Sequence, residues 1–102
     1  MSEVTLKDIN TRLIKTDEEL AEAMTQLLPM ELEYEGKRRN FMLRSQMPNQ
    51  AKQEAEAYEL LQQEAIFEKY HEQVLKVKIL TQRLRTLQTV SSNIKSYAYD
   101  TT

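Results

Sequence analysis

Cysteine and tryptophan are absent from this chain of 102 residues, and it holds one glycine and two prolines. Without cysteine the chain forms no disulfide and no thiolate metal site, which excludes redox chemistry of that kind and agrees with a reducing compartment. Glycine and proline supply the backbone conformations of tight turns. Their scarcity, together with 40% hydrophobic and 29% charged residues, predicts an all-α protein built from long helices.

Charge and hydropathy exclude further classes of protein. The 14 basic and 16 acidic side chains give a formal net charge of -2, so no overall field attracts nucleic acid or an anionic membrane. The longest apolar runs, Leu27 to Met30 and Phe41 to Leu43, are too short for a membrane span or a signal peptide. We therefore expect a cytoplasmic protein, in the host cytoplasm if the source is viral. Its length predicts a single domain over residues 1–102.

The second half of the chain predicts one long helix over about residues 50–98. Neither glycine nor proline occurs between Asn49 and Tyr97, and good helix formers fill most positions. Apolar residues recur at steps of three, four and seven and make one stripe: Leu60, Phe67, Tyr70, Val74, Val77, Leu80, Leu84, Leu87, Ile94 and Ala98. A flanking row widens it: Leu61, Ala65, Ile66, Leu75 and Ile79. So broad a face suits the interior of a bundle.

The first half predicts a second helix over about residues 5–45. Thr5 and Asp8 have the spacing of a capping box. From Leu6, alternate steps of three and four reach positions 6, 9, 13, 16, 20, 23, 27, 30, 34, 37 and 41, nine of which are apolar or aromatic. Because this register continues past Pro29, we expect a helix that is kinked there.

Three features of the first half leave alternatives open. The helix could instead break at Pro29, with that proline in the first turn of a new helix. Thr16 and Glu19 offer another capping box, so a separate segment could end before Asp17. Gly36 could allow a close helix crossing or act as a hinge, or it could be a surface glycine that the helix tolerates.

A short turn at about residues 46–49 joins the two arms. Pro48 disfavours helical geometry at Met47, and Ser45 or Asn49 could cap the following helix. So short a link predicts a long antiparallel helical hairpin, similar to a coiled coil. Near the turn, we expect Lys37, Arg38, Arg39 and Arg44 to face Glu54, Glu56 and Glu59. Since two helices alone would leave the flanking row exposed to solvent, we also expect a homodimer that forms a four-helix bundle.

Segregated charge supplies the candidate binding surface. The second arm has five bases and no acid from Lys76 to Lys95, and these are the predicted partner-binding residues: Lys76, Lys78, Arg83, Arg85 and Lys95. The first arm has seven acids and no base from Asp17 to Glu35. The pattern predicts a module that presents helical surface to a protein partner, as an adaptor or an inhibitor. The alternative is single-stranded nucleic-acid binding through the basic half, with Tyr97 and Tyr99 as the available stacking residues.

No pattern in the sequence predicts chemistry. His71 is the one histidine, and Glu68 alone among its neighbours shares its face, so we expect a surface histidine and neither a metal ligand nor a catalytic base. Phosphate-binding glycine loops, nucleophile elbows and zinc spacings are absent. We expect no enzyme activity, no cofactor and no metal.

Three segments of the middle half of the chain carry a resemblance to a known group of proteins. They are Glu31 to Lys37, Arg44 to Gln46 and Asn49 to Ala55. In these the chain resembles small all-helical proteins encoded in the early replication and recombination gene clusters of tailed bacteriophages. The resemblance implies an accessory protein that acts through protein contacts near phage DNA metabolism or host defence, and it assigns no catalytic residues.

Overall fold

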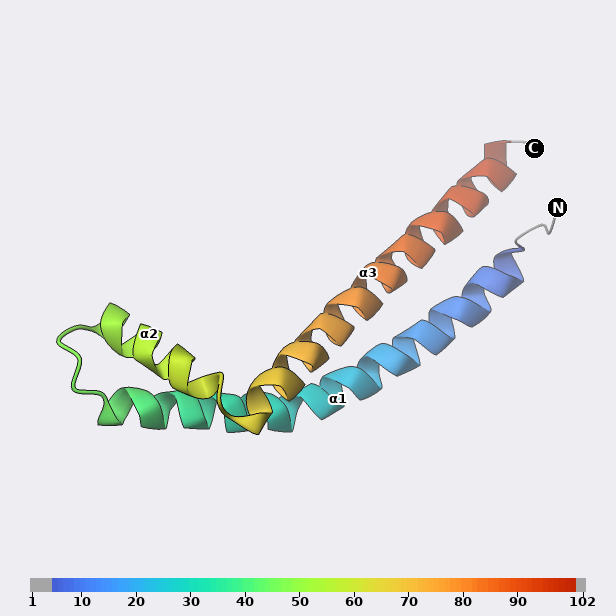
Figure 1. Ribbon diagram of the computed structural model, residues 1–102. Coiled ribbons are helices and arrows are strands. Elements are labelled where there is room, and N and C mark those ends of the chain that lie inside the picture. The colour runs from blue at the N-terminus through green and yellow to red at the C-terminus, as the bar shows by residue number, and fades with distance from the viewer. Residues whose placement is uncertain (1–4, 101–102) are drawn as a thin grey trace. The chain divides into compact units, whose positions relative to one another are not determined.

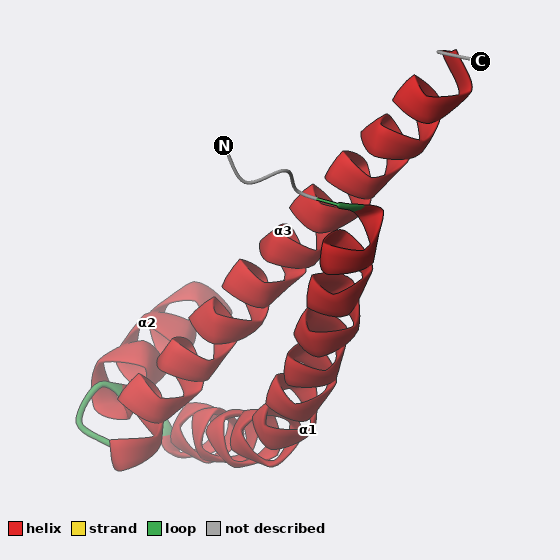
Figure 2. Ribbon diagram, turned by 90° about the vertical axis from the view of Figure 1, so that its right-hand side faces the viewer, coloured by secondary structure: helices red, strands yellow, loops and turns green. Residues whose placement is uncertain are grey.

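Three helices make up the described chain, which in this computed structural model comprises residues 5–100, with side chains up to residue 96. They are α1 (Leu6–Arg44), α2 (Gln50–Leu61) and α3 (Ala65–Asp100) (Figures 1 and 2). The described residues contain no strand. The all-α prediction is therefore confirmed.

Helix α1 begins at the predicted capping box. The Asp8 backbone N–H donates to Thr5 Oγ1 at 3.2 Å, and the Thr5 N–H donates back to Asp8 Oδ2 at 3.3 Å. The helix then runs without a break through Pro29 for 39 residues. The helix therefore continues past Pro29 as predicted, and neither alternative, a break at Pro29 or one before Asp17, occurs. All eleven positions of the predicted register, from Leu6 to Phe41, are buried or half-buried, because alternate steps of three and four keep them on one face.

The prediction of one unbroken second arm is wrong. Asn49 caps α2 as expected, accepting from the Lys52 N–H at 2.9 Å, but that helix ends at Leu61. In the next residues the chain tightens to bonds between residues three apart, from the Gln63 N–H to the Leu60 oxygen at 3.2 Å and from the Glu64 N–H to the Leu61 oxygen at 2.9 Å. This 3₁₀-like turn separates α2 from α3.

Packing around Tyr34 explains the break. Leu61 and Ile66 are 1% and 6% exposed, and both belong to the hydrophobic cluster that contains Tyr34. In a continuous α-helix, residues five apart lie about 140° apart around the axis, so the two side chains would not share a face. The irregular turn lets both be buried, although no residue between them disfavours a helix.

The described chain divides into two compact units. One, residues 24–75, contains the second part of α1, α2 and the start of α3. In it α2 runs back along α1 from the turn (Figure 1). Met30, Phe41, Phe67 and Tyr70 surround the buried cluster of Tyr34, Leu61 and Ile66. This unit has the larger apolar core.

The other unit pairs the first part of α1, to Ala23, with α3 from Lys76 onward. The start of α1 and the end of α3 lie at the same end of this unit, so its two helices are antiparallel (Figure 1). Ile9, Ala23 and Leu80 are buried in their seam, together with the polar residues Thr16 and Ser91. Two helices provide one seam, and Ile14 and Ile79 stay 62% and 48% exposed.

The flanking row that predicted a dimer is covered only in part within the chain. Leu61 and Ile66 are buried in the residue 24–75 unit, whereas Leu75 and Ile79 are 57% and 48% exposed. Ala65 is exposed as well, so packing within the chain buries two of the five residues of the flanking row.

Polar contacts around the 45–49 turn differ from the predicted charge pairing. The Ser45 hydroxyl donates to Glu56 Oε2 at 3.0 Å, and Gln53 Nε2 donates to the Met47 carbonyl at 3.2 Å. Lys37 forms an ion pair with Glu64 at 2.8 Å, in the break between α2 and α3. Arg38 pairs with Glu35 on its own helix at 3.0 Å. Arg38, Arg39 and Glu54 line one pocket near the turn, so these charges face each other as expected. Within the described residues, however, none of the four bases forms an ion pair with Glu54, Glu56 or Glu59.

Gly36 is exposed in α1, and a Cβ placed there would meet nothing within 4 Å. A close helix crossing at this position is therefore excluded. We expect Gly36→Ala to raise the free energy of unfolding by about 0.5–1 kcal/mol, because alanine loses less backbone entropy in a helix. Thermal and urea unfolding followed by circular dichroism test this. A destabilised Gly36→Ala variant would contradict the open surroundings of this residue.

Leu61 is the largest fully buried side chain among the described residues. We expect Leu61→Ala to destabilise the protein by about 2–5 kcal/mol through lost burial and the cavity left behind. Leu43→Ala is the matched control, because Leu43 is 84% exposed, and we expect it to change stability by less than about 0.5 kcal/mol. Equal urea midpoints for the two variants would show that Leu61 does not anchor the core.

Candidate partner-binding groove

The five predicted partner-binding residues are all exposed on α3, but they do not form one face. Lys76 and Arg83 each precede a seam residue, Val77 and Leu84, and lie on one flank of the seam. Lys78 and Arg85 each follow one of those residues and lie on the other flank. Lys95 lies ten residues, or about 15 Å, beyond Arg85. The structure therefore separates the predicted site into parts.

Arg83 lies in a groove between α1 and α3, within the unit that these two helices form. The groove has a volume of about 290 Å³. Its lining combines cations, a hydroxyl, a carboxylate and an apolar side chain: Arg12, Lys15, Thr16 and Glu19 from α1, and Arg83 and Leu87 from α3. The bases from α1 were not among the predicted site residues.

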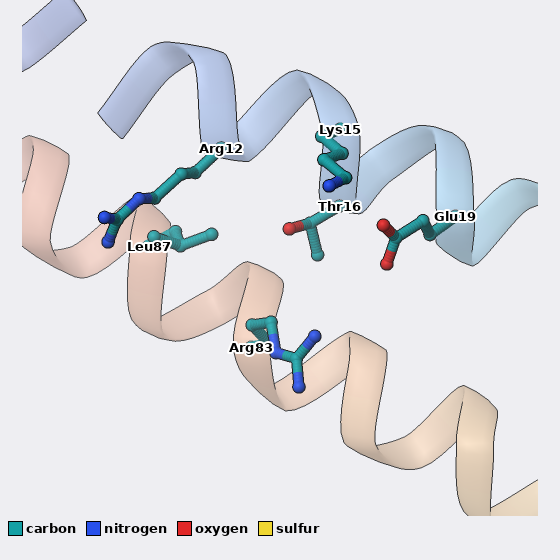
Figure 3. A pocket seen from close by; sticks show the side chains of 6 residues that line it. All are labelled: Arg12, Lys15, Thr16, Glu19, Arg83 and Leu87. Atoms are coloured by element: carbon teal, nitrogen blue, oxygen red, sulfur yellow. The ribbon is translucent and has the colours of Figure 1, made fainter. Parts of the chain in front are cut away.

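Figure 3 shows how these side chains lie. Arg12, Thr16 and Glu19 extend from α1 toward α3, and Arg12 and Glu19 stand at opposite ends of the row. Thr16 is 6% exposed, so it forms the floor. Within the part of the chain that the structure describes, none of Arg12, Lys15 and Arg83 has an ion-pair partner within 4.0 Å. Three cations thus meet around one groove without neutralisation by the protein.

This arrangement suits a carboxylate ligand with a base nearby. The guanidinium groups of Arg12 and Arg83 can each hold a carboxylate by two parallel hydrogen bonds. Glu19 follows Arg12 by seven residues, two turns or about 10 Å along α1. It would repel a second anion and attract a cation. The groove therefore matches a ligand that carries an acid and a base about two helical turns apart.

A ring cluster occupies the residue 24–75 unit and includes His71. Tyr34 stacks on Tyr70 with ring centroids 4.4 Å apart, and the His71 ring meets Phe67 edge-on at 4.4 Å. His71 is exposed, as predicted for a surface histidine. Over the described residues, no group of three or more His, Cys, Asp or Glu side chains is placed to hold a metal ion.

Three groups in this unit have clearly shifted pKa values. Burial raises the pKa of the Tyr34 phenol, and the neighbouring Tyr58 and Tyr70 add to the rise. The hydrogen bond to Glu64 raises the pKa of the Lys37 ammonium. Burial likewise raises the pKa of Tyr70, with Glu31 and Glu35 contributing. All three groups hold their protons to higher pH in the folded chain.

Comparisons with family models, curated proteins and solved structures give no match to this chain. None of the helices, over the residues described, has a stretch apolar enough to cross a lipid bilayer. The side chains of Tyr97 and Tyr99, the predicted stacking residues, lie outside the described ones. The case for function therefore depends on the groove and the surfaces beside it.

The raised pKa values predict alkaline destabilisation. Above the unfolded pKa of about 10 for tyrosine, the folded state binds more protons than the unfolded state, so stability falls as pH rises. The stabilisation that comes from the raised pKa values is fully present below pH 10. It is lost as the pH rises through the pKa of each group in the folded chain. We expect the urea midpoint to drop between pH 9 and 11, and Tyr34→Phe to make the drop shallower while keeping the buried ring.

Tyr58→Phe is the control, because Tyr58 is 49% exposed. Because Tyr58 only adds to the rise that burial causes in the Tyr34 pKa, we expect Tyr58→Phe to make the alkaline drop shallower by less than Tyr34→Phe does. If Tyr34→Phe and the wild type lost stability equally between pH 9 and 11, burial of the Tyr34 phenol would not be the cause.

Proposed function

We propose that this protein acts by binding, as an adaptor or an inhibitor without catalysis, and that it holds an acidic segment of a protein partner in the groove between α1 and α3. The observation that carries this proposal is the meeting of Arg12, Lys15 and Arg83 around one groove without ion-pair partners. Unpaired cations beside an apolar residue such as Leu87 offer both charge attraction and buried contact.

Charge distribution supports the same proposal. In the sequence, residues 1–23 and 76–102 contain eight Lys or Arg and seven Asp or Glu, whereas residues 24–75 contain six and nine. The unit with the groove is therefore the more basic one, in a chain whose net charge is -2. A local positive field of this kind steers an acidic partner to one place and raises the association rate.

Single-stranded nucleic acid is the second candidate ligand, since phosphates also pair with arginine. The same three cations favour it, and its binding would weaken steeply as salt rises. Glu19 argues against it, because a continuous phosphate chain passing Arg12 and Arg83 would meet this carboxylate. An accessory role in a phage, which the sequence resemblance implies, is compatible with either ligand.

The test reverses the groove charges. We expect Arg12→Glu with Arg83→Glu to keep the helix content of the wild type and to weaken binding of an acidic partner by roughly a hundredfold, because like charges then face each other. Two probes are used: proteins cross-linked to the chain in cells of its source, and a labelled single-stranded oligonucleotide at low salt. Lys7→Glu with Lys95→Glu is the matched control, with the same change in net charge outside the groove.

Loss of a cross-linked protein in the groove variant, with retention in the control, supports the proposal. Equal loss in both variants would show that only net charge matters. Retention in both would remove the groove from the docking surface. If the oligonucleotide alone bound in a groove-dependent way, the nucleic-acid function would replace the protein-binding one.

A further inference from the structure

Apolar side chains extend the α3 wall of the groove beyond the residues that line it. Ile79, Arg83 and Val90 follow one another at steps of four and seven residues, so they lie on one flank of α3. Leu87 lines the groove between this flank and the seam. Ile79 is 48% exposed, and Leu87 and Val90 are half-buried. From Ile79 to Val90 this wall is an apolar strip about 16 Å long, interrupted by the guanidinium of Arg83.

The α1 wall of the groove carries charge instead of apolar surface. Arg12 and Glu19 stand at opposite ends of the row of side chains, with Lys15 between them in the sequence (Figure 3). Arg12 and Lys15 are exposed, and Glu19 is half-buried. An apolar wall that faces a charged one fits a ligand with one apolar side and one charged side. The groove is therefore shaped for an amphipathic segment.

The backbone of the two walls favours a helical ligand over an extended one. Both walls are α-helices, whose backbone N–H and C=O groups bond within each helix, and the described residues contain no strand. An extended peptide would turn part of its backbone toward an apolar strip that offers no hydrogen-bond partner. A helix satisfies these groups internally and presents its apolar residues at steps of three and four.

From the apolar strip and the unpaired cations we propose that the occupant of the groove is an amphipathic α-helix of the partner protein, which packs along α1 and α3 as a third helix of this unit. This inference rests on the proposed function, because it states the form of the acidic segment. The apolar side of that helix covers Ile79, Leu87 and Val90. Its charged side carries an acid that faces Arg12 and, two turns along, a base that faces Glu19.

Selection from a displayed library of random peptides tests the helical form without assuming a partner sequence. The peptides have about 20 residues, enough for about 30 Å of helix. The full-length wild-type chain is the target, and peptides that also bind the variant Arg12→Glu with Arg83→Glu are removed. We expect the remaining, groove-dependent peptides to carry apolar residues at steps of three and four, with an acid and a base about seven residues apart beside that row.

Affinities measured by fluorescence anisotropy then separate the helical form from charge alone. A selected peptide locked as a helix by a side-chain link should bind roughly tenfold more tightly than the same peptide with a central proline, because the link removes the cost of ordering the peptide. Ile79→Ser should weaken binding of the locked peptide by roughly tenfold, since it removes an apolar contact.

Ile14→Ser is the matched control, because Ile14 is an exposed isoleucine of the same unit. It lies two residues before Thr16, or about 200° around α1, and so points away from the groove. We expect this variant to bind the locked peptide as tightly as the wild type does.

The outcomes separate this inference from the function on which it rests. Groove-dependent peptides without the helical period, or a proline peptide that binds as tightly as the locked one, would rule out the helical form and leave the binding of acidic segments in place. Equal affinities of the Ile79→Ser and Ile14→Ser variants would show that the apolar strip does not contact the ligand. A selection that gave no groove-dependent peptide would overturn both this inference and the proposed function.

Discussion

Burial of Tyr34 is the constraint on which the residue 24–75 unit depends. Its side chain is 7% exposed and belongs to one buried cluster with residues from both sides of the break, Leu61 before it and Ile66 after it. Covering a ring of this size needs both of them, and a continuous helix would turn one away. The chain gives up regular α-helical hydrogen bonding at residues 63 and 64 and gains an aliphatic and aromatic core. Packing thus overrides the local helix propensity of Gln62, Gln63 and Glu64.

The parts of the fold that could be predicted from the sequence depend mostly on residues that are close together in the chain. The Thr5 and Asn49 caps and the register of α1 each depend on residues within one or two turns, and all three are confirmed. The break after Leu61 depends on Tyr34, which is 27 residues earlier in the chain. No spacing within residues 50–98 records that contact. The feature of the sequence that reflects this contact is the pair of overlapping apolar rows, one with Leu60 and one with Leu61.

The candidate groove was predictable only in part, for the same reason. Arg83 stood out because it belongs to a run of bases without acids. Arg12 and Lys15 did not, because each is close in sequence to an acid and neither belongs to such a run. Their position beside Thr16, a buried member of the α1 register, was the available signal. Assigning them required knowing which residues of α1 and α3 lie opposite each other, and the short link that predicted antiparallel arms does not fix that register.

The turn between α2 and α3 has a consequence for how the length of this chain can vary. In α1, which is continuous from Leu6 to Arg44, one inserted residue would rotate everything after it by about 100° and remove half of the helix from its seam. At residues 62–64 the backbone is already irregular, so an insertion changes the connection and leaves the phase of each helix intact. Related sequences that differ in length should therefore differ at this joint, while α1 keeps its residue count.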